Sequence, residues 1–115
     1  MVSYPNLDVS LRCTYTFIRT EAGLLWTWDP EKDRRNRARH GLPLSLGEVV
    51  LADPLAVSLP DPHPDADRWD TVGMVEEMAV FVVHTWPDDE DGIGRIISVR
   101  LASRSERKAY EDGER

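Results

Sequence analysis

Residues 68–101 read RWDTVGMVEEMAVFVVHTWPDDEDGIGRIISVRL, and this stretch decides the fold. It contains three apolar, β-branched runs, which predict strands at Arg68–Val75, Met78–Trp86 and Gly94–Leu101. Two short reversals separate them, Glu76-Glu77 and the acidic segment Pro87–Gly92. Short connections join antiparallel neighbours, because a parallel connection needs a crossover of about a dozen residues or more. The centre of the protein is therefore predicted to be an antiparallel sheet.

Helix signals lie upstream of this stretch. Asp29-Pro30 favours a helix start, because aspartate caps free N–H groups and proline suits the first turn. The helix is predicted to cover 30–40 and to end before Gly41. A second helix is predicted over 45–53, because Ser45-Leu46-Gly47-Glu48 matches a capping box.

The remaining elements complete an α+β fold with an antiparallel sheet, two N-terminal helices and one C-terminal helix. A second capping box, Ser103-Arg104-Ser105-Glu106, predicts the last helix over 104–111. Two further short strands are predicted at Leu24–Trp28 and Leu55–Leu59. The domain is predicted to cover 24–112. Residues 1–23 are interpreted as an extension, in which the alternation of Leu11–Ile18 is compatible with a strand.

The composition is that of a globular protein, with 115 residues of which 41% are hydrophobic and 30% charged. The single cysteine, Cys13, excludes an internal disulfide. No apolar run is long enough for a membrane span, and the first ten residues lack the pattern of a signal peptide. A cytoplasmic location is therefore expected.

The charge is unevenly distributed. The net charge of −7 argues against a nucleic-acid partner when taken alone. However, basic residues gather at 32–39 and 95–108, whereas acidic residues gather at 61–70 and 88–91. Such segregation is typical of a local basic patch, and equally of two solvated faces.

Three polar residues of the first helix, Lys32, Asn36 and His40, are spaced four apart and so share one face. A lysine, an amide and an imidazole in a row are suited to holding a phosphate and moving a proton. The alternatives are structural: Asn36 binds nearby backbone groups, and His40 caps the helix end.

The last predicted strand places Ser98 and Arg100 on one face and Val99 on the other. An arginine within an apolar strand needs a partner, because an unpaired charge there is costly. An internal carboxylate such as Asp53 and an external phosphate are both candidates.

In the last helix, Glu106 is a candidate general base, and Tyr110 a second polar group. The capping box alone also explains Glu106, and packing on the sheet also explains Tyr110. Four loop residues with metal-binding side chains, Asp61, His63, Asp65 and Asp67, lack the spacing of a known metal motif. We therefore expect a reaction without a metal or another cofactor.

Taken in order, these residues resemble the BrnT toxin family over about 24–111. The matching pieces are Trp28-Asp29-Pro30-Glu31-Lys32, Asn36, Arg39-His40-Gly41, Glu48, Asp53-Pro54, Arg68, Val72-Gly73, Val80–Thr85, Arg95–Arg107 and Tyr110.

The resemblance implies a RelE-like fold and a ribonuclease that blocks translation. It also implies a partner, a BrnA-type antitoxin with a ribbon-helix-helix DNA-binding domain. In such an enzyme the 2′-hydroxyl of the RNA attacks the adjacent phosphate, so cations and proton-transfer groups are needed. The implied catalytic residues are Arg68, Arg95, Arg100, His40, Glu106 and Tyr110, and the implied substrate-binding residues are Lys32, Asn36, Arg39 and Arg104.

Three features depart from this pattern: the extension 1–23, the acidic loop 88–91 and the low net charge. They leave a second hypothesis open. The chain is then a non-enzymatic subunit, or an inactivated toxin, that pairs with a DNA-binding antitoxin and modulates its repression.

Overall fold

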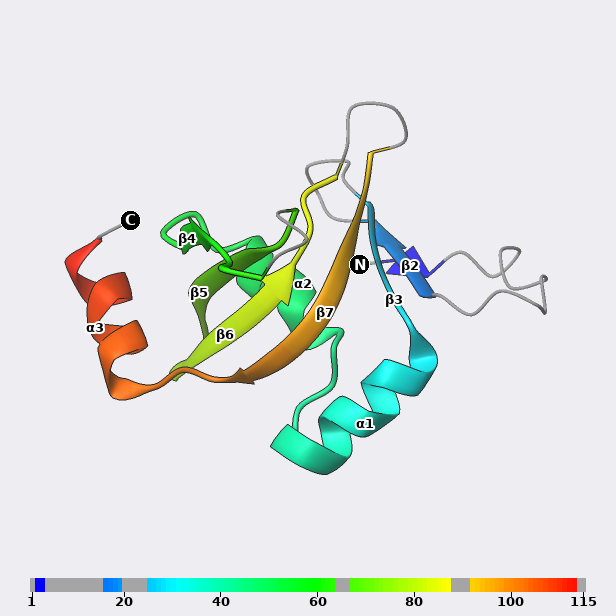
Figure 1. Ribbon diagram of the computed structural model, residues 1–115, viewed down its shortest axis with the longest axis horizontal. Helices are drawn as coiled ribbons and strands as arrows, with labels where there is room; N and C mark the ends of the chain where they lie inside the picture. Colours follow the sequence, from blue (N-terminus) through cyan, green and yellow to red (C-terminus); the bar gives the residue numbers. More distant parts are fainter. Residues whose placement is uncertain (1, 4–15, 20–24, 64–66, 88–91, 114–115) are drawn as a thin grey trace.

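The computed structural model describes residues 2–3, 16–19, 25–63, 67–87 and 92–113 as one mixed sheet with helices (Figure 1). Of the alternating segment 11–18, the last residues form part of β2 (Thr16–Arg19), and the others lie outside the described residues. β2 pairs with β1 (Val2–Ser3) and β3 (Leu25–Trp28) at one end of the sheet. The acidic loop 88–91 also lies outside the described residues.

The predicted antiparallel strands are confirmed. β4 (Val57–Pro60), β5 (Trp69–Val75), β6 (Met78–His84) and β7 (Ile93–Leu101) lie side by side, each antiparallel to the next. The register shifts between Val83 and His84, which face Ser98 and Ile96, so that Ile97 is the extra residue of a β-bulge.

The prediction of a purely antiparallel sheet is wrong at one pair, because β3 runs parallel to β7. The rule for short connections does not apply here, since residues 29–92 separate the two strands and include two helices. β3 and β7 are closely packed at one position. Trp26 of β3 lies over Gly94 of β7, where an added Cβ atom would be 2.5 Å from the indole ring.

The first and last helices form as predicted. The N-cap Asp29 of α1 (Pro30–His40) accepts a hydrogen bond from the Glu31 N–H at 2.9 Å, and Gly41 ends the helix in the left-handed region. In α3 (Arg104–Asp112), Ser103 and Glu106 form the reciprocal capping box.

The second helix also forms as predicted, as α2 (Leu46–Leu51), but its predicted capping box is wrong. Ser45 has helical backbone angles and makes no side-chain cap, because it belongs to a turn in which the Leu46 N–H donates to the Pro43 carbonyl. Glu48 is buried instead of reaching back to the helix start.

The core lies between the sheet and the two helices α1 and α2. It is built by Trp26, Trp28, Leu44, Val50, Val80, Val82, Ile96 and Val99. By contrast, α3 lies apart from these helices, at the side of the molecule opposite β2 (Figure 1). One sheet face therefore packs against α1 and α2, whereas these two helices do not cover the opposite face.

Asn36 attaches α1 to the sheet and is the buried residue of this otherwise polar helix. Its Nδ2 atom donates to the carbonyl groups of Val99 at 2.7 Å and Leu42 at 2.8 Å. Its Oδ1 atom accepts from the Val99 N–H at 3.1 Å. These bonds fix the helix on β7 without a large apolar contact.

Candidate active site

A cluster of charged residues, formed by Arg100, Glu106, Asp61 and Asp70 and termed the charged cluster, lies on the sheet face that α1 and α2 do not cover. Opposed residues of antiparallel strands share a face. The register therefore places Asp70 beside Val83 and Phe81 beside Arg100 on this face. Ser98 opposes Val83 and shares the face with Arg100, as predicted. The buried Val99 side chain lies on the opposite face, within the core.

Arg100 and Glu106 form a two-pronged ion pair between β7 and α3. The Nη1 and Nη2 atoms of Arg100 lie 2.9 Å from Oε1 and Oε2 of Glu106. The guanidinium carbon also lies 3.9 Å from the centre of the Phe81 ring, which supports it from below. A planar guanidinium whose two Nη atoms are both held by hydrogen bonds is rigid, and its shape also suits a second oxyanion.

Asp53, one of the two candidate partners of Arg100, is used elsewhere. The Asp53 carboxylate accepts hydrogen bonds from the N–H groups of Leu55 and Met74, both at 2.9 Å. It also accepts the hydroxyl proton of Tyr110 at 2.8 Å. Arg100 instead pairs with Glu106, which lies six residues further along the chain in the first turn of α3. Tyr110 thus ties α3 to the turn after α2.

Asp61 and Asp70 join the cluster, although the sequence singled out neither as catalytic. Their carboxyl groups lie close enough to interact, and each affects the pKa of the other. Burial, followed by the interaction with Asp61 and its negative charge, raises the pKa of Asp70 to about 7. The interaction with Asp70 is the main cause that lowers the pKa of Asp61. The pair therefore shares one proton near neutral pH.

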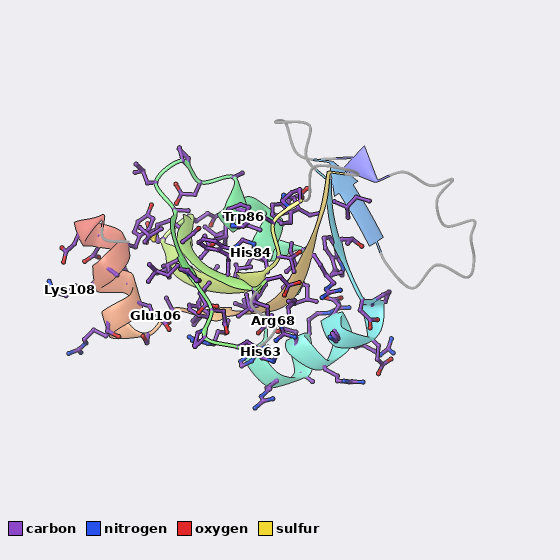
Figure 2. All side chains as sticks on the ribbon, turned by 45° about the horizontal axis from the view of Figure 1, so that its top comes forward. His63, Arg68, His84, Trp86, Glu106 and Lys108 are labelled. Atoms are coloured by element: carbon purple, nitrogen blue, oxygen red, sulfur yellow. The ribbon has the colours of Figure 1, made fainter. Side chains whose placement is uncertain are left out.

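Arg68 and His63 lie on the loop that enters β5, between α3 and α1 in the view of Figure 2. The Arg68 carbonyl accepts the Asp61 N–H at 2.9 Å, and the His63 N–H donates to the Asp61 carboxylate at 2.8 Å. The charges of His63 and Arg68 also help to lower the pKa of Asp61. Arg68 therefore lies near Asp61, which in turn interacts with Asp70.

The ion pair keeps both of its members charged. The hydrogen bond to Glu106 raises the pKa of Arg100. Burial alone would raise the pKa of Glu106, but the bonds from Arg100 and Ser103 lower it below its usual value. Glu106 is therefore a carboxylate at neutral pH, whereas Asp70 retains its proton over much of that range.

Lys32 and Arg95 meet at a different place. Together with Asp29, Ile96 and Ile97 they line a depression of about 110 Å³ beside the start of α1. Two predicted cations from separate elements therefore share one small hollow. Its size and charge suit a phosphate group of a longer chain better than a reacting centre.

Four further predicted residues lie outside the charged cluster. Arg39 is exposed and His40 half-buried at the end of α1, and Arg104 is exposed at the start of α3. Both amide hydrogens of Asn36 are used within the fold, so we assign it a positioning role in place of a substrate contact. Within the described ranges, no three His, Cys, Asp or Glu side chains group as metal ligands.

His84 forms a buried polar chain on the core side of the sheet, which the sequence did not reveal. Its Nε2 atom lies 2.6 Å from the Thr71 hydroxyl, which in turn lies 2.7 Å from the Ser58 hydroxyl. Its Nδ1–H donates to the Thr85 carbonyl at 3.1 Å. Trp26 and Trp86 contact the imidazole edge-on, and Trp86 lies beside His84 in Figure 2. This enclosure lowers the pKa of His84 to about 4 through burial.

The buried imidazole predicts an acid-sensitive fold. The pKa of His84 falls from 6.5 to about 4 on folding, so the unfolded chain binds the proton first as pH decreases through this window. Between pH 7 and pH 5 this group alone is expected to remove about 2 kcal/mol of unfolding free energy. Urea unfolding of His84→Gln and the unaltered chain at both pH values isolates this effect. Equal pH dependence of the two proteins would contradict it.

The fold has a counterpart among known proteins. A family model described as the ribonuclease toxin BrnT of type II toxin–antitoxin systems matches residues 28–106. The crystal structure of the Brucella abortus ribonuclease toxin BrnT is similar, with 28% sequence identity and a TM-score of 0.52. The similarity covers 67% of this chain and 94% of that one. No curated protein matches. The matched range includes Arg68, Asp70, Arg100 and Glu106, and stops before Tyr110.

Proposed function

The chain belongs to the BrnT family of ribonuclease toxins from type II toxin–antitoxin systems, and we propose that it is an endoribonuclease that blocks translation. The observation that carries this proposal is the fixed guanidinium of Arg100 on the sheet face opposite α1 and α2, paired with Glu106 and close enough to Asp70 to affect its pKa. This arrangement provides a cation for a phosphate and carboxyl groups for proton transfer. The C-terminal helix beside this sheet face also supports a RelE-like arrangement.

The proposed reaction uses the RNA as its own nucleophile. The 2′-hydroxyl oxygen attacks the adjacent phosphorus, which leaves a 2′,3′-cyclic phosphate and a 5′-hydroxyl end. Negative charge grows on the phosphate oxygens in the transition state, and donors fixed in advance stabilise it most. Arg100 and Arg68 take this role, and the reaction needs no metal ion.

RNA binding requires contacts beyond the reacting phosphate, because the chain carries a net charge of −7. The hollow lined by Lys32 and Arg95 provides a second cationic position. We propose that it holds a phosphate several nucleotides away, which makes Arg95 a binding residue in this scheme. The exposed Arg39 and Arg104 side chains are further candidates for backbone contacts.

A partner follows from the family. A type II toxin is paired with an antitoxin protein, and we propose a BrnA-type antitoxin with a ribbon-helix-helix domain. Contact with DNA is then indirect, through the antitoxin. No helix in the described residues is long and apolar enough to cross a membrane. We propose that the complex acts in the cytoplasm, where its RNA substrate is found.

The test is induced expression of the chain in a bacterium, measured as growth and as the integrity of total RNA. The unaltered chain is expected to arrest growth and fragment RNA. The Arg68→Ala/Arg100→Ala double variant, checked for folding by circular dichroism, is expected to do neither. Normal growth and intact RNA with a folded, unaltered chain would contradict the ribonuclease proposal and favour a non-enzymatic binding subunit.

A further inference from the structure

The close approach of the Asp61 and Asp70 carboxyl groups favours a shared proton. Two ionised carboxylates repel each other and cannot form a hydrogen bond, whereas one carboxylic acid and one carboxylate can. The Oδ1 atom of Asp70 is buried, and no donor within the described residues reaches it. The enclosed position therefore favours the protonated form of Asp70 on geometric grounds alone.

The position of this proton matches the needs of the reaction. Asp70 and Arg100 lie on the same sheet face. Asp70 is aligned through Val83 with Ser98, and Arg100 follows Ser98 by two residues in β7. The charges of Arg100 and Glu106 both act on the Asp70 carboxyl, so the three groups lie within one small region. A phosphate held by Arg100 would therefore lie on the same sheet face as the Asp70 carboxyl.

We propose that Asp70 is the catalytic acid that protonates the leaving 5′-oxygen, with Asp61 as its positioning residue. This inference rests on the ribonuclease function proposed above. As the O2′–P bond forms, the 2′-hydroxyl proton passes to the Glu106 carboxylate. As the P–O5′ bond breaks, the Asp70 proton passes to the departing oxygen. Glu106 gains one proton and Asp70 loses one, so the net charge of the protein is unchanged. Exchange with water then removes the proton from Glu106 and restores that of Asp70.

The charged groups around Asp70 determine its pH range. Asp61 and His63 come from the loop after β4, Arg68 from the start of β5, Arg100 from β7 and Glu106 from α3. Burial and the interaction with Asp61 raise the pKa of Asp70 to about 7, and Arg100 opposes this. A general acid acts in its protonated form, so cleavage is expected to decline as the pH rises above about 7.

The sharpest test changes the leaving group. A site cut in total RNA is first mapped, and the same sequence is then made as a synthetic RNA with the bridging 5′-oxygen either kept or replaced by sulfur. A thiolate leaves without a proton. Asp70→Asn is expected to cleave the oxygen substrate about 100-fold more slowly and the sulfur substrate at nearly the unaltered rate. Asp67→Asn, at an exposed neighbouring position, is the matched control and should cleave both normally.

Asp61→Asn provides the second measurement. It removes the neighbouring negative charge, so the pKa of Asp70 falls and the decline in cleavage begins at a lower pH, by about one unit or more. Equal loss on both substrates in Asp70→Asn, or no loss on either, would overturn the proton-donor role and leave the ribonuclease function standing. Failure of the unaltered chain to cleave either RNA would overturn both.

Discussion

Asn36→Ala is expected to lower the free energy of unfolding by about 3–5 kcal/mol, the largest effect of any single change in α1. The substitution removes three hydrogen bonds, two of which satisfy the buried N–H and carbonyl of Val99. Each buried backbone group left without a partner costs about 1–3 kcal/mol. Urea unfolding followed by tryptophan fluorescence measures the loss.

Arg35→Ala is the matched control for this prediction, because Arg35 lies in the same helix with 71% of its side chain exposed. Its long contact to Glu31 is a surface ion pair, and its loss is expected to change stability by less than about 0.5 kcal/mol. If Asn36→Ala were equally mild, the amide would be free to bind substrate, as the spacing with Lys32 and His40 first indicated.

Arg100→Ala is expected to lower kcat/KM for RNA cleavage by about a thousandfold, and Arg100→Lys by about a hundredfold. Lysine restores the positive charge but not the planar pair of donors that Glu106 and a phosphate both require. The measurement is steady-state cleavage of the mapped synthetic RNA. It extends the expression test, because it separates loss of charge from loss of geometry.

Two further variants sharpen the interpretation. Lys108→Ala removes a cation from the outer side of α3, where Lys108 pairs with Asp112, and should leave cleavage unchanged (Figure 2). Glu106→Gln keeps the capping-box geometry but removes the carboxylate, and the proposed proton acceptor is lost with it. Full activity in Arg100→Ala would show that the phosphate binds elsewhere on the molecule.

The strands and the three helices could be predicted because their signals are local. Alternation, turn residues and caps act over a few positions, and β5, β6 and β7 follow them closely. The parallel pairing of β3 with β7 has no such signal, since it joins segments far apart in the chain. The two capping-box sequences make the same point: that of Ser103 forms, whereas the surrounding turn prevents that of Ser45.

The candidate site was predicted in part for similar reasons. The cost of an unpaired arginine in an apolar strand correctly required a partner for Arg100, but did not identify Glu106. The same reasoning applies to Asp70, a carboxyl group in a strand rich in apolar residues, and would have indicated it. Asp61 could not be found in this way, because its pairing with Asp70 depends on how the loop after β4 returns to the sheet.

The parallel pairing of β3 with β7 also affects when the protein first becomes active. Ribosomes build the chain from its N-terminus, so β3 and α1 are complete long before β7 is made. Until then β3 lacks its parallel neighbour, Asn36 lacks the backbone of Val99, and Arg100 and Glu106 do not exist. A nascent chain therefore has no assembled site. On the proposed function, the ribosome that synthesises the protein is protected from it until β7 and the start of α3 have been made.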